Sequence, residues 1–290
     1  MNKPKLIAEI GCNHGGSFDE AIKMIDIASS YCNVDAVKFQ KRHIPSVLTQ
    51  SERTTPHPVP HNSYGITYGE HREALEFTVE EHEGLRDYAH NVKIGYGCSV
   101  WDMQSMEDII GVGPDFIKVP SACNTNFAMI EALAKNYMGD IHISMGMTTR
   151  EEYAMIIECV KKTGRINDFV FYACTSAYPV DFEDVKLNAV QYMHRFIRGA
   201  GGIGFSGHHK GIAIDVAAYA LGAEYIERHF TLDRTLKGTD HAASLEPDGM
   251  RKLARNLDET YMSMGLRGKD ILNCEKDARK KLRWDRHENA

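Results

Sequence analysis

The sequence predicts an α/β protein of the (β/α)8 TIM barrel class, because of its length, its eight strand-like runs and the helical patterns between them. The chain has 290 residues, and about 250 residues is typical of one such barrel. The strand-like runs are KLIAEI, AVKFQ, IGYGCS, FIKVPS, IHISMG, FVFYAC, GIGFSG and YIERHF. Strands that alternate with helices form parallel sheets with right-handed crossovers, so eight repeats predict a closed barrel with all strand carboxyl ends on one face.

Helical patterns fill the intervals between these runs. Apolar residues recur at helical spacing in 19–30, 79–91, 149–162 and 212–221. A hydrophobic fraction of 43% supplies enough apolar side chains for one large core. We therefore expect residues 1–290 to form a single catalytic domain, with a charged, solvated helix or tail from about 270 to 290.

One connection is longer than the others. Residues 42–77, rich in His, Pro, Ser and Thr, follow the second predicted strand and so belong on the catalytic face of the barrel. Long connections on that face are commonly lids or substrate-binding elements. We expect this one to be functional rather than a tolerated insertion.

Composition and charge argue against several kinds of partner. The 34 Lys and Arg and 40 Asp and Glu residues give a net charge of -6 and are spread along the chain, without the basic face that nucleic acid or an anionic membrane needs. The sequence shows no export signal and no apolar run approaching the roughly 18 residues of a membrane span. Seven cysteines without a C-x-x-C pair indicate buried thiols in a reducing cytoplasm.

Polar side chains end nearly every predicted strand, on the face where characterised barrel enzymes have their active sites. Two lysines and three serines among them suit a small phosphorylated anion, since Lys supplies a point charge and Ser neutral donors. A single strand-end lysine more often extends to solvent, but two lysines with three serines favour anion binding. The anion-binding group is Lys38, Ser99, Lys118, Ser121 and Ser144, and Gln40, Ser176 and Ser206 stand at the same strand ends.

Two histidines, His208 and His229, end the neighbouring seventh and eighth strands, where their imidazoles could face one metal ion. Asp240 and Glu9 would add carboxylates, directly or through water. A lone strand-end histidine is more often structural than a ligand, so both interpretations stay open. Glu227 shares the inward side of its strand with His229 and is either a second acid or the partner of an inward salt bridge.

Strand alternation predicts that Arg228 points away from the barrel interior. His14 lies between glycines in GCNHGG, where it either approaches a ligand or fills a turn. The GGIG stretch at Gly201–Gly204 lacks G-x-G-x-x-G spacing and leads into a strand, which argues against a nucleotide loop.

The order of the motifs resembles the catalytic barrel of the N-acetylneuraminate (sialic acid) synthase family. The matching stretches, from Ile7 to about Arg267, are AEIGCNHGG, DAVKFQK, IKVPSACNTN, ISMGM, YACTSAYP, GFSGHHKGIA, ALGAEYIERHFTLDR and GTDHAASLEPD. The resemblance implies a transferase that condenses phosphoenolpyruvate with an N-acylated aldohexose, N-acetylmannosamine by default. It further implies a divalent metal, Mn2+ with Mg2+ or Co2+ as alternatives, and a homodimer.

The resemblance also implies residue roles. His208 and His229 resemble the family's metal ligands, and Asp240 and Glu9 its nearby acids, with Glu9 handling the proton of the water that adds to phosphoenolpyruvate. Glu9, His229 and Asp240 would thus form the catalytic group. Gln40 and Tyr178 resemble sugar-side contacts, and the anion-binding group resembles the contacts to phosphoenolpyruvate.

The chain departs from the family pattern at several positions. Gly207 stands where an acid is common, which would remove an orienting carboxylate from the metal shell. Cys123 replaces an acidic residue, and Val100–Trp101 replaces a Pro-Phe pair. The sequence also ends where two-domain relatives continue into an antifreeze-like domain. We hypothesise that residues 42–77, with Arg72 and His71 as polar contacts, cover the sugar in its place.

Other functions stay open. One alternative is a synthase acting on a diacetamido-trideoxy hexose or a hexosamine 6-phosphate. Another is a non-catalytic sugar-binding barrel that needs a partner chain, which Gly207 and Cys123 favour. Retention of both lysines, both histidines, Glu9 and Asp240 favours catalysis.

Overall fold

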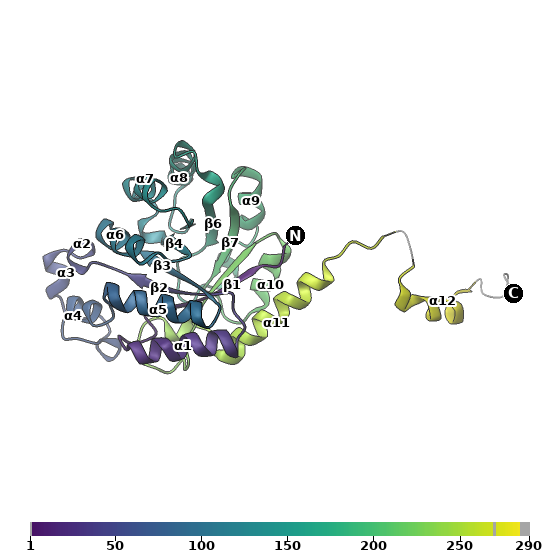
Figure 1. The fold of residues 1–290 in the computed structure, drawn as a ribbon, viewed down its shortest axis with the longest axis horizontal. Helices are drawn as coiled ribbons and strands as arrows, with labels where there is room; N and C mark the ends of the chain where they lie inside the picture. Colours follow the sequence, from purple (N-terminus) through teal and green to yellow (C-terminus); the bar gives the residue numbers. More distant parts are fainter. Residues whose placement is uncertain (1, 269–270, 285–290) are drawn as a thin grey trace.

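The structure, a computed structural model, describes residues 2–268 and 271–284 and contains a closed barrel of eight parallel strands (Figure 1). Each strand pairs with the next, and β8 pairs with β1. The strands are β1 (Lys5–Gly11), β2 (Ala36–Lys41), β3 (Gly95–Val100), β4 (Phe116–Val119), β5 (Asp140–Ser144), β6 (Phe169–Cys174), β7 (Gly202–Gly207) and β8 (Tyr225–His229). Each overlaps one predicted run, so the (β/α)8 prediction is confirmed.

Helices surround the barrel and cover the outward faces of its strands (Figure 1). Several begin at a capping box, in which a threonine such as Thr78 or Thr149 exchanges hydrogen bonds with a glutamate three residues later. The helices are α1 (Phe18–Ser30), α2 (Ile44–Val47), α3 (Gln50–Thr54), α4 (Tyr68–Glu73), α5 (Val79–Asn91), α6 (Met103–Val112), α7 (Phe127–Asn136), α8 (Arg150–Lys162), α9 (Ala189–Phe196), α10 (Ala213–Ala220), α11 (Pro247–Ser263) and α12 (Lys276–Leu282).

The barrel interior changes from apolar to polar along its axis. At the amino ends of the strands, Ile7, Ala36 and Phe116 form a small buried cluster. Lys118 comes two residues after Phe116 on β4, and Glu227 comes two residues after Tyr225 on β8. Because strand side chains alternate, both lie on the inward side of their strands. The charged groups therefore lie beyond a packed layer at the amino ends of the strands.

The long connection after β2 is folded rather than irregular. It contains α2, α3 and α4, and capping boxes at Thr49 and Thr67 begin the latter two. The Tyr64 hydroxyl donates to the Lys237 carbonyl oxygen at 2.6 Å, and the Lys237 ammonium lies 4.7 Å from the Tyr64 ring. The 42–77 segment is thereby fastened to the connection that follows β8.

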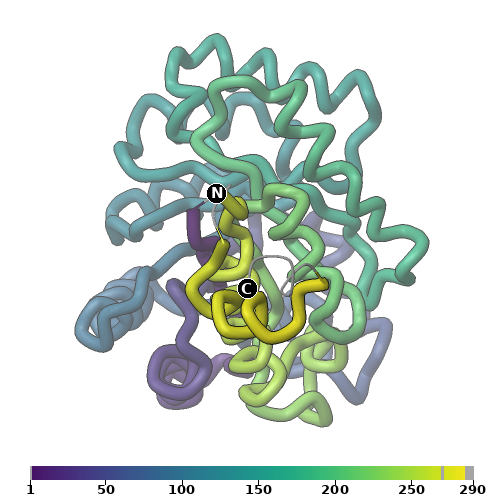
Figure 2. The backbone as a smooth tube through the Cα atoms, turned by 90° about the vertical axis from the view of Figure 1, so that its right-hand side faces the viewer, coloured from purple at the N-terminus to yellow at the C-terminus, as the bar shows by residue number. Residues whose placement is uncertain are grey.

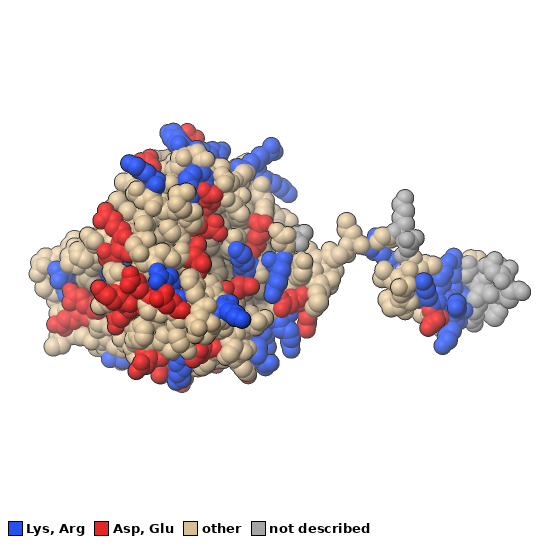
Figure 3. All heavy atoms as spheres, viewed as in Figure 1, with Lys and Arg blue, Asp and Glu red and all other residues tan. Residues whose placement is uncertain are grey.

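The carboxyl-terminal segment extends away from the barrel. After α11 the chain continues to the exposed helix α12, which points toward the viewer in Figure 2 and carries basic side chains in Figure 3. Within the tail expected at about 270–290, the structure describes residues 271–284, which include this helix, and residues 270 and 285–290 lie outside the described residues. The seven cysteines are free thiols, of which Cys32, Cys98 and Cys159 are buried, Cys12, Cys123 and Cys174 are partly buried, and Cys274 is exposed. Within 2–268 and 271–284 no helix is long and apolar enough to span a bilayer.

Candidate active site

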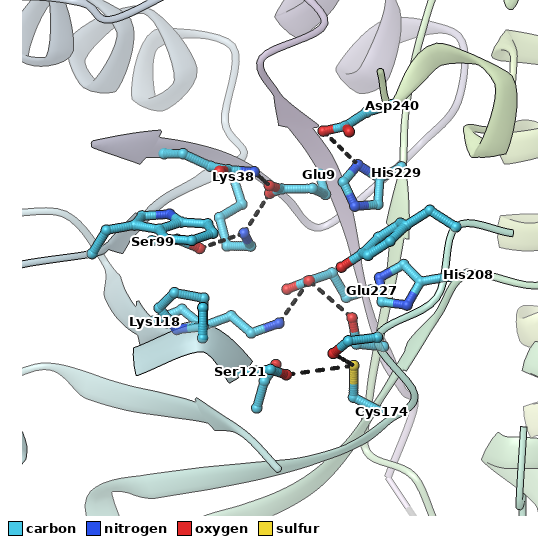
Figure 4. Close-up of a pocket in the computed structure, with 18 of the residues that line it drawn as sticks. Glu9, Lys38, Ser99, Lys118, Ser121, Cys174, His208, Glu227, His229 and Asp240 are labelled. Atoms are coloured by element: carbon cyan, nitrogen blue, oxygen red, sulfur yellow. Dashed lines mark hydrogen bonds and ion pairs between the residues drawn. The ribbon is translucent and has the colours of Figure 1, made fainter. Parts of the chain in front are cut away.

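A cavity of about 290 Å³ opens at the carboxyl ends of the strands (Figure 4). Side chains from all eight strands, from the 42–77 segment and from the connection after β8 line it. The sequence-predicted residues that line it are Glu9, Lys38, Gln40, Arg72, Ser99, Lys118, Ser121, Ser144, Ser176, Tyr178, Ser206, His208, His229 and Asp240. The barrel has brought side chains up to 231 residues apart in sequence, Glu9 and Asp240, to one place.

Lys38 and Glu9 form the first of two buried ion pairs. Lys38 Nζ lies 2.5 Å from Glu9 Oε2, and the two side chains are 3% and 2% exposed. Lys38 also donates to Ser99 Oγ at 2.7 Å, while Gln40 Nε2 donates to Glu9 Oε1 at 2.7 Å. Burial alone would lower the pKa of Lys38, but the charges of Glu227 and Glu9 outweigh it and raise the pKa above the ordinary 10.5. Lys38 is therefore a fixed cation.

Lys118 and Glu227 form the second pair, with Lys118 Nζ 2.6 Å from Glu227 Oε1. Burial lowers the pKa of Lys118 from 10.5, and Glu227 only partly offsets this. For Glu227, burial alone would raise the pKa, but Lys118 and Lys38 outweigh it and hold the pKa below 4.5. The structure thus shows Glu227 in the inward salt bridge that was one of its two sequence interpretations.

The charges around the cavity balance. Lys38, Lys118, Arg42 and Arg72 are the cations of the lining, and Glu9, Glu227 and Asp240 its carboxylates. Glu76, beside the lining, lies 3.0 Å from Arg42 and supplies a fourth carboxylate. Arg72 differs from the other three cations, because it has no carboxylate within ion-pair distance among the described residues and bonds only to the Tyr68 hydroxyl. An anion that enters can therefore bind Arg72 directly, whereas at Lys38 and Lys118 it must displace the carboxylate that is already paired with the lysine.

His208 and His229 face each other across one side of the cavity, with ring centroids 5.5 Å apart. His208 Nδ1 lies 3.0 Å from the Thr175 carbonyl oxygen. Since a carbonyl only accepts, Nδ1 carries the proton and the Nε2 lone pair is free. Burial lowers the pKa of His208 to about 3, so its imidazole is neutral. The Tyr178 ring packs 4.3 Å from the His208 ring, and Asp240 Oδ2 lies 4.0 Å from His229 Nδ1.

This pair fits a divalent ion with two protein ligands and open positions. A neutral imidazole that donates its other nitrogen to a carbonyl, as His208 does, is typical of a metal-ligating histidine. His229 Nδ1 is buried and makes no hydrogen bond. No group of three or more His, Cys, Asp or Glu side chains suited to a metal occurs in the described ranges, so water and substrate oxygens would complete the coordination.

Two histidines considered from the sequence do not reach the cavity. His14 stacks on Phe77 at 4.1 Å, and its Nδ1 accepts from the Gly16 N–H at 3.1 Å, so it fills a turn. His71 is buried within the 42–77 segment, where its Nδ1 accepts from the Tyr64 N–H at 3.1 Å. The hypothesis that His71 contacts the sugar is wrong, because its ring holds the segment together instead.

The expectation for Gly207 is also wrong. A Cβ at Gly207 would lie 3.0 Å from both Asp215 Oδ1 and His209 Cε1, on the outer side of β7. A side chain there would point away from the cavity, so its absence takes no carboxylate from around His208. Two further positions differ from the family pattern. Trp101 lines the cavity, whereas Cys123 does not, and its thiol donates to the Trp101 carbonyl oxygen at 3.2 Å.

Sequence reasoning missed several lining residues. Arg42 stacks on Trp101, with the guanidinium carbon 4.5 Å from the ring, and donates to Gln40. The missed signal was alternation, since Lys38, Gln40 and Arg42 are every second residue along and just beyond β2. Cys174, at the end of β6, follows the same rule and lies 3.8 Å from Ser121 Oγ.

The buried Lys118–Glu227 pair predicts how substitutions of its two residues change the free energy of unfolding. Lys118→Met leaves a buried carboxylate without its closest cation, and we expect the free energy of unfolding to fall by about 3–5 kcal/mol. Adding Glu227→Gln should recover much of that loss, because no buried charge is then stranded. Urea unfolding measures both, with Lys162→Met in the exposed Lys162–Glu158 pair as the control that changes little. A Lys118→Met loss no larger than the control's would contradict the buried-pair interpretation.

Comparisons with known proteins identify relatives of this chain. A family model described as the NeuB family matches residues 24–269. The chain is 39% identical over 277 residues to N-acetylneuraminate-9-phosphate synthase of Homo sapiens, covering 96% of this chain and 76% of that protein. It is 31% identical over 266 residues to N,N'-diacetyllegionaminic acid synthase of Campylobacter jejuni, covering 91% and 78%.

A solved structure shows the same architecture. It is the crystal structure of N-acetylneuraminic acid (sialic acid) synthetase from Leptospira borgpetersenii in complex with citrate. It superposes with a TM-score of 0.78 at 29% identity and covers 98% of this chain and 93% of that one. With the family match extending over most of the chain, and with the barrel and its cavity in place, the chain belongs to the NeuB family.

Proposed function

We propose that the chain condenses phosphoenolpyruvate with an N-acylated hexosamine to form a nonulosonic acid and inorganic phosphate. The observation that carries this proposal is the convergence of two lysine–carboxylate pairs and several serine hydroxyls beside two imidazoles in one cavity. The family relationship supports it, since relatives across the family are named as synthases of such acids. The expected homodimer and the cytoplasmic location stay predictions.

Lys38 and Lys118 would bind the anionic groups of phosphoenolpyruvate in place of their carboxylate partners. In the structure each lysine charge is balanced by a carboxylate, so neither is stranded inside the barrel. An entering phosphate or carboxylate replaces that partner with charge-assisted hydrogen bonds. The hydroxyls of Ser99 and Ser206, already bonded within the two pairs, lie in place to donate to the same ligand.

Glu9 is suited to act as the base once Lys38 turns to the substrate. In the condensation, the electrons of the C2–C3 double bond of phosphoenolpyruvate form a bond from C3 to the aldehyde carbon of the open-chain sugar, whose oxygen takes up a proton. Water then adds at C2, and the bond between C2 and the phosphate oxygen breaks. Glu9 would accept the proton of that water, while Gln40 keeps the carboxylate oriented through its 2.7 Å bond to Oε1.

His208 and His229 would hold the divalent ion, Mn2+ by resemblance, with Mg2+ or Co2+ as alternatives. Bound there, the ion would supply Lewis-acid polarisation of the sugar aldehyde. The Thr175 carbonyl keeps His208 Nε2 unprotonated for this role. Asp240, 4.0 Å from His229, is placed to act through water or to orient that ring.

Arg72 favours a phosphorylated acceptor over N-acetylmannosamine itself. Its guanidinium lines the cavity without a carboxylate partner among the described residues, and it belongs to the 42–77 segment, which Tyr64 joins to Lys237. A guanidinium recognises phosphate well, because its donors match two oxygens at once. The human relative is named for a 9-phosphate product, which agrees with a hexosamine 6-phosphate as acceptor.

Phosphate release from phosphoenolpyruvate tests the proposed function. Protein stripped with a chelator and resupplied with Mn2+ should release phosphate only when an acceptor is present. The panel holds N-acyl hexosamines, their 6-phosphates and a diacetamido-trideoxy hexose. We expect the 6-phosphates to be used best. Silence with every acceptor, in protein that still binds phosphoenolpyruvate, would instead indicate a non-catalytic barrel.

Arg72→Ala tests the acceptor assignment. Losing a charge-assisted hydrogen bond to phosphate should lower kcat/KM for the 6-phosphate about 10–100-fold, with the KM for phosphoenolpyruvate unchanged. Arg53→Ala is the matched control, since Arg53 is in the same segment but pairs with Glu73 outside the cavity. Unchanged acceptor kinetics in Arg72→Ala would show that this arginine does not recognise the sugar.

A further inference from the structure

A second buried charge cluster lies on the other side of the barrel wall, away from the cavity. Arg228 on β8, Asp215 in the first turn of α10 and His209 in the connection between β7 and α10 are 1%, 0% and 1% exposed. None of the three lines the cavity. Arg228 points outward from β8, as alternation predicted, while its neighbours Glu227 and His229 line the cavity.

The Arg228 side chain holds the backbone that follows His208. Nη2 donates to the His209 carbonyl oxygen at 2.8 Å, and Nη1 donates to the Gly211 carbonyl oxygen at 2.8 Å. Nη1 also donates to Asp215 Oδ2 at 2.5 Å. One guanidinium therefore ties β8, α10 and the carbonyls of His209 and Gly211, which follow His208, into a single unit.

The cluster depends on the charge of Asp215 and on the missing side chain of Gly207. Burying a guanidinium is costly unless a carboxylate compensates it, and Asp215 is the carboxylate that does so. Gly207 lies opposite Arg228 in the β7–β8 register. A Cβ there would approach Asp215 Oδ1 to 3.0 Å and the Phe205 ring to 2.8 Å, so glycine leaves the room that this arrangement needs.

His208 itself is held from the opposite side. Its Nδ1 bonds to the Thr175 carbonyl oxygen at 3.0 Å, and its own carbonyl oxygen accepts from the Val180 N–H at 3.1 Å. These contacts fix the ring and its peptide on the cavity side, whereas Arg228 fixes the next residues on the outer side. Together they leave the His208 backbone little freedom to move.

We propose that Arg228, Asp215 and His209 are positioning residues for His208, and that the cluster sets the imidazole at the distance from His229 that ligand binding requires. The proposal rests on the proposed function only in giving His208 a metal-binding role. Loosening the cluster should impair what His208 binds and leave the lysine side of the cavity intact.

Asp215→Asn tests this, because it keeps the shape of the side chain and removes the charge. The matched control is Asp168→Asn. Asp168 pairs with Arg165, which likewise donates to two backbone carbonyls, those of Ala134 and Tyr137, away from the cavity. If Asp215→Asn does not fold, Arg228→Lys replaces it, since lysine keeps the charge for Asp215 but lacks the planar fork of donors with which arginine bonds both carbonyls.

Four measurements separate positioning from general stability. They are urea unfolding and hydrogen exchange of the amides in 208–212 in the unliganded proteins, Mn2+ binding by electron paramagnetic resonance, and the dissociation constant for phosphoenolpyruvate. We expect Asp215→Asn to weaken Mn2+ binding about tenfold or more and to speed exchange in 208–212, with the dissociation constant for phosphoenolpyruvate changed less than twofold. Asp168→Asn should lower stability without either local effect.

The outcomes distinguish the two proposals. If exchange in 208–212 is no faster in Asp215→Asn than in Asp168→Asn, or if Mn2+ and phosphoenolpyruvate binding weaken equally, the positioning role is overturned. If wild-type protein binds no Mn2+ but the local exchange effect is present, the positioning of His208 stands and the metal-dependent function fails.

Discussion

Two lysine–carboxylate pairs enclosed in the barrel are the constraint on which the rest of the site depends. A lysine alone in this interior would lose its proton or destabilise the fold, because burial disfavours the charged form. The β1–β2 register places Glu9 beside Lys38, and barrel closure brings Glu227 to Lys118. In each pair the carboxylate keeps the lysine charged although it is shielded from water. When a ligand anion binds the lysine, it replaces that carboxylate, which is then released.

The arrangement of the barrel explains why these pairs lie at one open end. A packed layer that includes Phe116 lies at the other end, and helices cover the outside of the strands. Residues 42–77 and the connection after β8 fasten to each other through Tyr64 and Lys237, and they contribute Arg72 and Asp240 to the cavity. The anion-binding centre is thus built from strands, whereas the side that would meet the acceptor is built from connections, where relatives with different acceptors are free to differ.

Much of this could be predicted from the sequence, and the limits have physical causes. Strand and helix periodicity predicted the barrel, and polar strand ends predicted the lining, because parallel strands all end on one face. Pairing could not be predicted, since Lys118 and Glu227 are 109 residues apart and meet only after closure. The expectation for Gly207 followed the family resemblance and was wrong. Strand alternation predicts the correct direction, because Ser206 and His208 line the cavity and the residue between them must point outward.

The most direct test of the central claim is calorimetric titration of phosphoenolpyruvate into the protein, with and without Mn2+, for wild type and Lys38→Met. The account predicts one site per chain in wild type and a large loss of affinity in Lys38→Met, while Lys162→Met on the exposed face of α8 binds as wild type does. No binding by folded wild-type protein, or equal affinity in Lys38→Met, would contradict the claim that the buried lysines hold this substrate.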